Sequence, residues 1–172
     1  DVSHCQSTIY SGTRLCDLDE SLQPINQALI NQGDIDQQSL AGAISTGTHG
    51  TGADLHCMSA YVEGFELLTA SGEILKCSRM EHPEIFAAGR ISLGSLGILT
   101  QITLQNRPRY KLKEHIELCA VEDMMQHIQQ WKQQHRHIEC FVFAHSKQLM
   151  LKTLDETDDE IQPRKENFPS DD

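Results

Sequence analysis

The sequence of 172 residues predicts a chain of mixed strands and helices, divided into two parts near Asn106–Arg109. Three observations lead to this prediction. Strand-prone runs joined by a tight turn precede the boundary, and a glycine-rich segment, Asn31–Gly52, lies before them. A strand, an amphipathic helix and two further strands follow the boundary. Hydrophobic residues form 38% of the chain and charged residues 23%, which is typical of a globular protein.

The elements before the glycine-rich segment are short. Ser7–Tyr10 is prone to form a strand. Leu15–Gln23 is predicted to form a helix with Asp17 or Asp19 as its N-cap, because short acidic side chains can bond the first free N–H groups. Pro24 ends this helix, since proline has no N–H to continue it.

A hairpin and a further strand follow the glycine-rich segment. Met58–Leu68 and Glu73–Cys77 flank a Ser-Gly turn, in which Gly72 can adopt a positive φ. His82–Ala88 is predicted to be a single helical turn opened by proline. Ile98–Leu104 alternates in character, so we expect a strand that places Ile98 and Leu104 on the same face.

The second part has the order strand, helix, strand, strand. Tyr110–Cys119 and Gln148–Leu154 are predicted strands on either side of the helix Val121–Gln134 and the strand Ile138–Ala144. This order is the beginning of a ferredoxin-like split unit. The charged segment from Asp155 onward is predicted to be a loop or disordered.

Charge and cysteine content exclude several classes of protein. The net charge is −11, and a nucleic-acid-binding surface needs clustered Lys and Arg instead. No apolar run is long enough to span a membrane, and residues 1–10 lack the pattern of a signal peptide. The six cysteines contain no C-x-x-C pair, which favours a reduced, cytoplasmic protein. Peripheral membrane association remains open.

The segment Asn31–Gly52 holds five glycines among small and hydroxylated residues. Glycine allows close approach of another group to the backbone, and successive N–H groups form a concave site for anions. A flexible linker is the alternative, but Leu40, Ala43 and Ile44 are apolar and compact. We therefore predict a loop that binds an anionic ligand. Ser92–Gly97 is a second small-residue segment, and the two loops could face each other around a long, flat ligand.

Common sequence motifs for such loops are absent. No glycine pair is followed by the Lys of a P-loop, and Gly47, Gly50 and Gly52 have the reverse spacing of a Rossmann fingerprint. Gly94–Gly97 is one residue too short for a hydrolase nucleophile elbow. The pair His135 and His137 has no further ligand nearby, so we predict no metal site. The apolar stripe of the second-part helix, with Met124, Met125 and Trp131, is interpreted as core.

Five segments of the sequence carry a resemblance to a known family: Gly12–Leu15, Gly33–Asp36, Ser39–Ala43, Thr46–Gly52 and Ser92–Ile98. In these segments the chain resembles the FAD-linked oxidases of the vanillyl-alcohol oxidase type. It is most similar to their aldonolactone oxidoreductase group, which includes gulonolactone and arabinonolactone oxidases and related alditol oxidases. Ile138–Phe143 and Lys152–Asp158 look like the opening of the substrate-side cap domain of that group.

The resemblance implies an α+β fold: the second subdomain of a PCMH-type FAD-binding domain in residues 1–106, then the beginning of a ferredoxin-like cap domain in residues 107–172. It assigns the following residues to FAD: Ser39, Gly42, Ser45, Gly47, Thr48, His49, Gly50 and Ile98. Of these, 47–50 would approach the pyrophosphate and ribityl chain, with 42 and 45 along the same path. Residue 98 would meet the adenine end, and residue 39 would lie near the isoalloxazine.

The expected activity is oxidation of a sugar-1,4-lactone or polyol, with oxygen or another electron acceptor. Two alternatives remain: an FAD oxidase of another alcohol or hydroxy acid, and a cofactor-free interaction module. The family's first FAD loop and its later cap residues have no match, and the chain does not begin with Met. We therefore expect an internal fragment and assign no catalytic residue.

Overall fold

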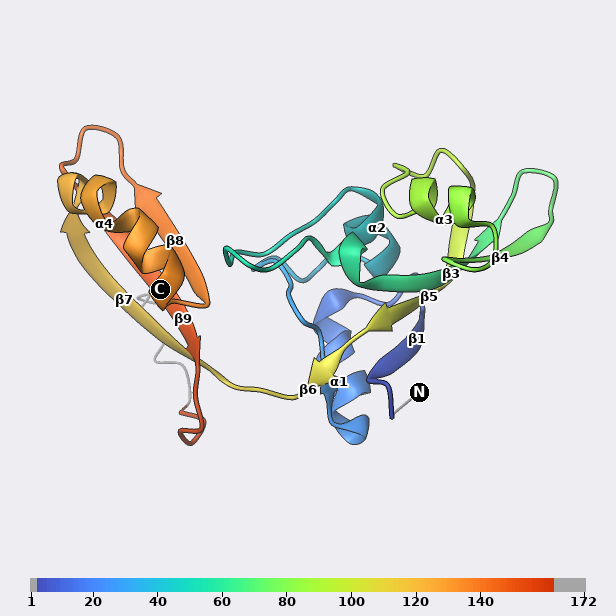
Figure 1. Cartoon of the computed structure of the whole chain (residues 1–172), viewed down its shortest axis with the longest axis horizontal. Helices are drawn as coiled ribbons and strands as arrows, with labels where there is room; N and C mark the ends of the chain where they lie inside the picture. The colour runs from blue at the N-terminus through green and yellow to red at the C-terminus, as the bar shows by residue number, and fades with distance from the viewer. Residues whose placement is uncertain (1–2, 163–172) are drawn as a thin grey trace, which may run out of the picture.

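The computed structural model describes residues 3–162, whose elements form a first part up to Pro108 and a second part from Leu112 onward (Figure 1). The described residues of the first part form an antiparallel sheet in the order β1-β5-β3-β4. Its strands are β1 (Gln6–Tyr10), β3 (Val62–Leu68), β4 (Ile74–Ser78) and β5 (Ile98–Gln105). Around this sheet lie η1 (Leu15–Asp17), α1 (Leu18–Leu22), η2 (Gln23–Ile25), α2 (Leu40–Ser45), η3 (Met58–Tyr61) and α3 (Pro83–Gly89).

The core of the first part lies between this sheet and the short helices. Burial of apolar side chains supplies most of the driving force for such packing. Phe65 of β3 stacks on Phe86 of α3 at 5.7 Å between ring centroids. The buried apolar residues of this core include Leu18, Leu22, Leu40, Ile44, Val62, Ile102 and Leu104.

The predicted hairpin is confirmed, and β5 departs from the prediction at one point. β3 and β4 pair as expected, and Gly72 in their turn has φ +86°. In β5, however, Leu99 is buried and Ile98 is 65% exposed, so these two do not lie on the predicted faces. Glu66 of β3 pairs with Gln101, whereas the next residue pairs with Leu99. The extra residue in β5 is a bulge, which reverses the alternation beyond it.

The predicted helix Leu15–Gln23 is three consecutive turns, η1, α1 and η2. Asp17 occupies the N-cap of α1, but its side chain forms no capping hydrogen bond, so the predicted cap is wrong. Pro24 lies in the first turn of η2, where a missing N–H costs nothing. The α-helix itself ends at Leu22, close to the predicted end.

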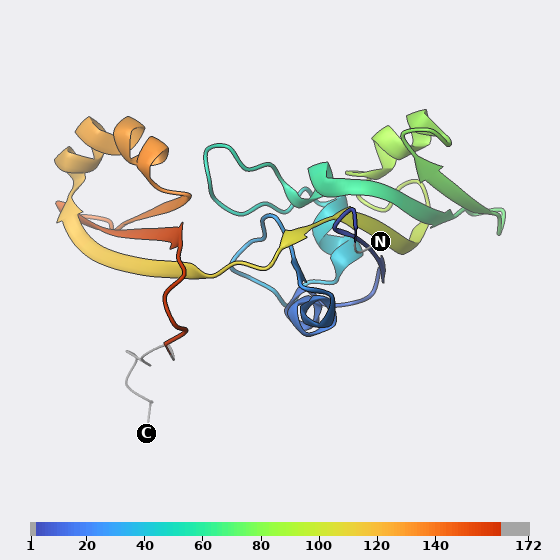
Figure 2. The ribbon, with the colours of Figure 1, turned by 60° about the horizontal axis from the view of Figure 1, so that its bottom comes forward.

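The second part is a three-stranded antiparallel sheet in the order β7-β9-β8, within the described residues, with helix α4 on one face (Figures 1 and 2). Its elements are β7 (Leu112–Ala120), α4 (Val121–Gln134), β8 (His137–Val142) and β9 (Gln148–Glu156). β9 lies between the two strands that flank α4, which is the predicted split unit.

The face of this sheet opposite α4 carries charged and polar side chains at the end near Leu154, and exposed apolar side chains such as Leu118 and Phe141 at the other end. Along β9, Leu149 and Leu151 are buried. Lys152 and Leu154 occupy the alternate positions and are partly exposed. Side chains of a strand alternate between its two faces. Lys152 and Leu154 therefore lie on the face away from α4, which we call the open face. The register places Glu114, His137 and Glu139 on the same face.

Two predictions about the second part are wrong. β9 extends through Asp155 and Glu156, because the Asp155 carboxylate accepts a 2.8 Å bond from the Arg136 N–H, and Arg107 binds Glu156. Residues 163–172 of the predicted tail lie outside the described residues. Helix α4 has no buried residue, and Met125 is 72% exposed, so its apolar stripe is not a closed core.

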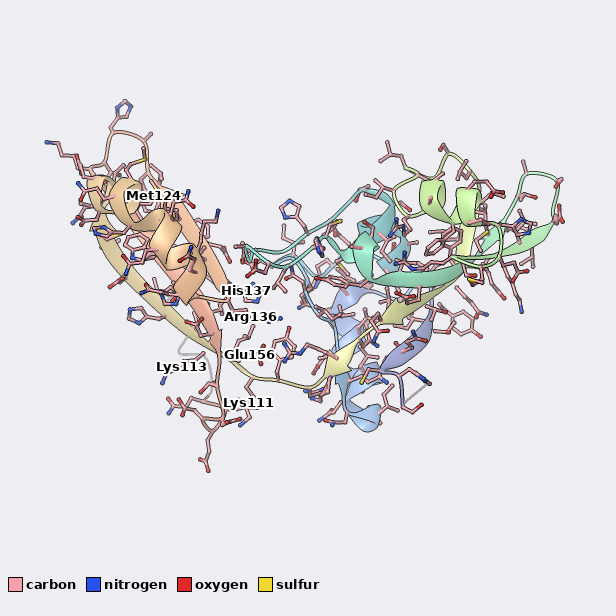
Figure 3. All side chains as sticks on the ribbon, viewed as in Figure 1. Lys111, Lys113, Met124, Arg136, His137 and Glu156 are labelled. Atoms are coloured by element: carbon pink, nitrogen blue, oxygen red, sulfur yellow. The ribbon has the colours of Figure 1, made fainter. Side chains whose placement is uncertain are left out.

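Four residues, Arg107, Tyr110, Arg136 and Glu156, hold the two parts together, and we call them the clamp. The carboxylate of Glu156 accepts bonds of 2.6 and 2.9 Å from Arg107 and lies 3.0 Å from Nη1 of Arg136. The Tyr110 ring lies 4.1 Å from one guanidinium and 5.1 Å from the other. Figure 3 shows Arg136 and Glu156 on the side of the second part that faces the first.

The clamp also bonds directly to the first part. The Tyr110 hydroxyl donates to the carbonyl oxygen of Leu29 at 3.2 Å. Nη2 of Arg136 donates to the carbonyl oxygen of Ile30 at 2.9 Å. In addition, β6 (Arg107–Pro108) pairs with β2 (Gln27–Ala28). The segment just before the glycine-rich loop is thus fixed against the second part.

We predict that the clamp makes stability dependent on pH through Glu156. Bonds from Arg107 lower the pKa of the Glu156 carboxyl. Its stabilisation is therefore complete above the pKa of an unfolded Glu, about 4.3, and is lost as the pH falls through the lower folded pKa. Glu156→Gln should reduce stability at pH 7 by about 1 kcal/mol, a modest value because the side chain is partly exposed.

Thermal unfolding of both proteins at pH 7 and at pH 3 measures this effect. The difference between wild type and variant should shrink at pH 3, which lies below the pKa of an unfolded Glu, so that part of the stabilisation is lost. Glu122→Gln, on the exposed side of α4, is the control and should leave the unfolding temperature unchanged at both pH values. A constant difference for Glu156→Gln at the two pH values would contradict the assignment.

Candidate functional site

The predicted binding loop contains a short helix, α2, which was not expected from the sequence. Ser39 is its N-cap, with φ −69° and ψ 153°, and its Oγ accepts a 3.2 Å bond from the N–H of Gly42. Leu40, Ala43 and Ile44 are buried in the core of the first part. The apolar residues that argued against a linker thus anchor a helix in the core, and the residues on either side of it, 31–38 and those after Ser45, form the loop.

The turn after α2 is closed by hydrogen bonds. Gly47 has φ +71°, a conformation that favours glycine, and its N–H donates to the Ile44 carbonyl oxygen at 3.1 Å. The Thr48 hydroxyl donates to Oε1 of Gln38 at 3.2 Å. His49 is exposed, and its Nδ1 donates to the carbonyl oxygen of Gly50 at 2.9 Å. The turn is therefore held in place by hydrogen bonds within the chain.

The side of Gly50 on which a Cβ would stand is packed against the chain's own backbone and is not open to a ligand. A Cβ at this position would overlap the carbonyl oxygen of Gln32 and lie 2.5 Å from Oδ1 of Asn31. A Cβ on Gly33 would in turn lie 3.2 Å from the carbonyl oxygen of His49. These glycines hold two backbone segments together, a role that composition alone could not separate from ligand binding.

The second small-residue loop does face the first, as expected. The N–H of Leu93 donates to the carbonyl oxygen of Ser45 at 3.1 Å. The Ile91 side chain lies 3.7 Å from where a Cβ of Gly47 would be. Ile98, at the end of this loop, lies at the start of β5.

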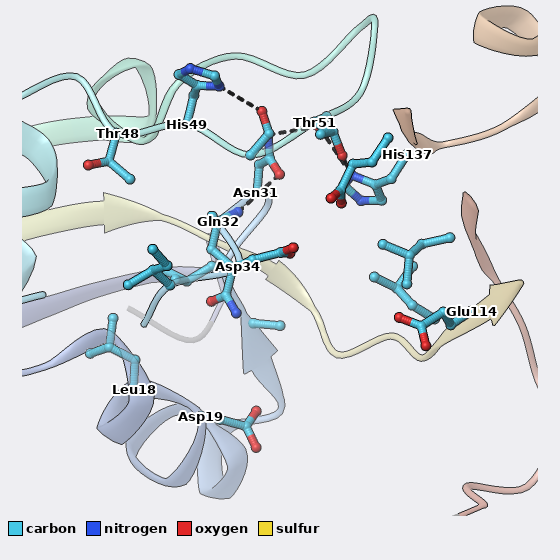
Figure 4. Close-up of a pocket in the computed structure, with 18 of the residues that line it drawn as sticks. Leu18, Asp19, Asn31, Gln32, Asp34, Thr48, His49, Thr51, Glu114 and His137 are labelled. Atoms are coloured by element: carbon cyan, nitrogen blue, oxygen red, sulfur yellow. Dashed lines mark hydrogen bonds between the residues drawn. The ribbon is translucent and has the colours of Figure 1, made fainter. Parts of the chain in front are cut away.

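A cavity of about 990 Å³ lies between the loop and the open face of the second part (Figure 4). Among the predicted site residues, Thr48, His49 and Gly50 line it. Ser39, Gly42, Ser45 and Gly47, which belong to α2 and its ends, do not line the cavity, and neither does Ile98. The opposite wall is formed by the following residues of the open face: Leu112, Glu114, His137, Glu139, Lys152 and Leu154.

Lys152 is the central charge of that wall. Its Nζ donates to Oδ2 of Asp34 at 3.0 Å and lies 3.3 Å from Oε1 of Glu139 and 4.0 Å from Oε2 of Glu114. Burial lowers the pKa of the ammonium, but the bond to Asp34 and the charge of Glu139 outweigh it, so the pKa is raised overall. Lys152 therefore remains protonated and links the second part to the loop residue Asp34.

His137 is a cavity residue that sequence reasoning weighed only as a metal ligand. It is 6% exposed, and its Nδ1 lies 3.1 Å from the carbonyl oxygen and 3.2 Å from Oγ1 of Thr51. Burial, and then the charge of Arg136, lower the pKa of the imidazole. The imidazole is therefore neutral at pH 7. No pattern within β8 or β9 marked this wall, since Phe141 and Met150 interrupt the polar positions on the same face.

Two families match the chain in separate segments. The family model described as an FAD binding domain matches residues 1–78, and that of D-arabinono-1,4-lactone oxidase matches residues 102–170. The L-gulono-1,4-lactone dehydrogenase of Mycobacterium tuberculosis is 33% identical over 91% of this chain and 36% of its own length. The D-arabinono-1,4-lactone oxidase of Candida albicans is 38% identical over 73% of this chain and 22% of its own length.

The chain belongs to the FAD-linked aldonolactone oxidoreductases. It spans about a third or less of the length of these relatives, since it covers 36% and 22% of them. The resemblance read from the glycine-rich segments is thereby confirmed, and so is FAD as the cofactor.

Solved structures confirm the fold of this chain. Cholesterol oxidase from Brevibacterium sterolicum superposes with a TM-score of 0.80 at 14% identity, over 88% of this chain and 32% of that one. The 6-hydroxy-D-nicotine oxidase from Arthrobacter nicotinovorans gives a TM-score of 0.72 at 20% identity, over 91% of this chain and 37% of that one. The predicted α+β fold of the PCMH-type FAD-binding class is therefore confirmed.

The loop residues fit FAD in their chemistry. Within the described residues, the N–H groups of His49 and Gly50 donate to no protein atom. Such free, adjacent N–H groups are suitable donors for phosphate and hydroxyl oxygens. The same described range contains no group of three or more metal-ligating side chains. None of its helices combines the length and apolar character that crossing a membrane requires.

Proposed function

We propose that the full-length protein is an FAD-dependent oxidoreductase that oxidises a sugar-1,4-lactone or a related polyol. The observation that carries this proposal is the cavity between the FAD-side loop, with Thr48 and His49, and the charged open face, with Lys152 and Glu139. A polyhydroxylated substrate requires many polar partners beside the cofactor. Relatives named for L-gulono-1,4-lactone and D-arabinono-1,4-lactone support this substrate class.

Eight residues are proposed to hold the cofactor: Ser39, Gly42, Ser45, Gly47, Thr48, His49, Gly50 and Ile98. Support is strongest for His49 and Gly50, whose N–H groups are free and which line the cavity. Ser39 and Gly42 are engaged with each other as a helix cap, so their contribution would come through the position of α2.

We further propose two units, residues 1–106 and 107–172, with the substrate between them. β6 follows the boundary in sequence but pairs with β2 of the first unit, and so ties the two together. Bound FAD supplies the oxidation itself, by taking up hydride from a carbinol carbon of the substrate. The residues of this chain bind and orient the substrate, and Lys152 with Asp34 closes one side of the cavity.

Oxygen or another acceptor is proposed to take the electrons afterwards. We also propose a reducing, cytoplasmic location, which is supported by the cysteines: all six lie in the described range and are free. Nothing in the described residues points to peripheral attachment to a membrane.

The visible spectrum of the purified full-length protein tests this function. We expect a yellow protein with flavin absorbance, bleached anaerobically by L-gulono-1,4-lactone or D-arabinono-1,4-lactone. A panel of polyols, aromatic alcohols and hydroxy acids separates the lactone oxidase from an oxidase of another alcohol. A colourless protein that gains no flavin on addition of FAD would refute the proposal and favour a cofactor-free module.

A further inference from the structure

The first residue of β8, His137, lies on the open face of the second part and lines the cavity (Figure 4). The register places it beside Leu154 of β9, two residues before Glu139 on the same face. Its side chain is 94% buried, since only 6% is exposed. A buried polar side chain in a cavity wall normally has hydrogen-bond partners for each of its polar atoms.

The contacts of one ring nitrogen determine where the proton of this imidazole lies. Nδ1 is 3.1 Å from the carbonyl oxygen of Thr51, and a carbonyl oxygen can only accept a hydrogen bond. Nδ1 therefore carries the hydrogen and donates it. In the neutral imidazole Nε2 is then a bare acceptor. Within residues 3–162, Nε2 of His137 is buried and has no hydrogen-bond partner.

The groups around this acceptor define the ligand that would complete it. Lys152 is the one ammonium among the described cavity residues, whereas the carboxylates of Asp34, Glu114 and Glu139 surround it. This excess of negative charge at the open-face wall disfavours an anionic group beside that wall, such as a hydroxy-acid carboxylate. Apolar surface from Leu112 and Leu154 lies beside the charged groups. The combination suits a neutral ring with several hydroxyl groups.

We propose that Nε2 of His137 accepts a hydrogen bond from a hydroxyl group of a neutral sugar lactone or polyol in this cavity. The proposal rests on the proposed function and specifies one substrate contact within it. His137 is then a residue that determines affinity and specificity. It takes no part in the transfer of electrons. Its bond to Thr51 keeps Nε2 as the acceptor.

Two amide substitutions in the full-length, flavin-loaded protein separate the roles of the two ring nitrogens. In His137→Asn the amide stands where Nδ1 was, so the bond to Thr51 is kept and the acceptor at Nε2 is lost. In His137→Gln the longer side chain places its oxygen near the former Nε2. Loss of one hydrogen bond should raise KM for the lactones about tenfold in the Asn variant. The Gln variant should retain most of the wild-type affinity, and kcat should change little in either.

A lactone analogue that lacks one ring hydroxyl sharpens the test. For the analogue that lacks the contacted hydroxyl, wild type and His137→Asn should have the same KM. His115→Asn is the matched control: it lies in β7, and its 68% exposed side chain is on the face opposite the cavity wall. This control should leave KM and flavin absorbance unchanged.

The other outcomes overturn the proposal. If the unsubstituted protein oxidises the lactones and His137→Asn has the same KM for every one of them, this inference is overturned and the proposed function stands. Loss of flavin absorbance in the Asn variant would show that the residue serves the cofactor instead. A larger rise in KM in the Gln variant than in the Asn variant would show that His137 acts structurally, through its hydrogen bond to Thr51. A yellow wild type that neither binds nor oxidises any lactone or polyol would overturn both proposals.

Discussion

Gly50→Ala is expected to remove most of the FAD from the protein. A methyl group at this position would overlap the carbonyl oxygen of Gln32 and press on Oδ1 of Asn31. Asn31 cannot move aside, because it is 3% exposed and its amide donates to the carbonyl oxygens of Thr51 and His56. The loop must therefore shift away, at a cost of about 3 kcal/mol, at the upper end of the range for overpacking.

The ratio of flavin absorbance to protein absorbance measures this effect, together with the unfolding temperature. Gly12→Ala is the matched control, since a Cβ there would meet nothing within 4 Å. It should retain the flavin and the stability of wild type. A normal flavin ratio in Gly50→Ala would show that the contact between 31–32 and 50 is dispensable for cofactor binding.

Tyr110→Ala is expected to loosen the second part from the first and to lower kcat/KM at least tenfold while flavin remains bound. The ring lies 4.1 Å from the guanidinium group of Arg107 and 5.1 Å from that of Arg136. Partly desolvated cation–π contacts of this kind contribute about 1 kcal/mol each. Without the ring, the guanidinium groups lose a packing surface, and the cavity wall is free to move.

Limited proteolysis of the segment after Pro108 and steady-state kinetics measure this loosening. Tyr10→Ala, in β1, removes a tyrosine that is 74% exposed and should change neither property. Tyr110→Phe removes only the bond to Leu29 and should have a small effect. An unchanged kcat/KM and cleavage rate in Tyr110→Ala would mean that the salt bridges of Glu156 hold the two parts without the ring.

The strands of both parts were predictable from the sequence because their alternation is local information. The features that the sequence did not predict also have physical reasons. The bulge in β5 arises from pairing with β3 between Glu66 and Leu67, and nothing in the β5 sequence itself encodes the extra residue. Helix α2 was missed because Leu40–Ser45 contains Gly and Ser, which are poor helix formers. Its burial and the cap from Ser39 overcome that propensity.

The site was predictable only on its loop side. The family resemblance identified the cofactor, which agrees with the matched family, whereas the binding role of the glycine-rich loop stays a prediction. The wall with His137 and Lys152 could not be derived, because it forms when β8 and β9 pair and the second part docks on Asp34 and Thr51. Such long-range pairs leave no pattern within either segment.

One dipeptide, Arg136–His137, takes part in both the clamp and the cavity wall. Arg136 donates to the Ile30 carbonyl oxygen, and His137 donates to that of Thr51. The proposed contact of His137 with substrate would therefore link substrate occupancy thermodynamically to the orientation of the two parts, and linkage is reciprocal. If loosening the clamp lowers substrate affinity by a given factor, bound substrate must favour the docked arrangement of the two parts by the same factor. Substrate analogues should accordingly protect the interdomain segment from hydrogen exchange, and less so in His137→Asn.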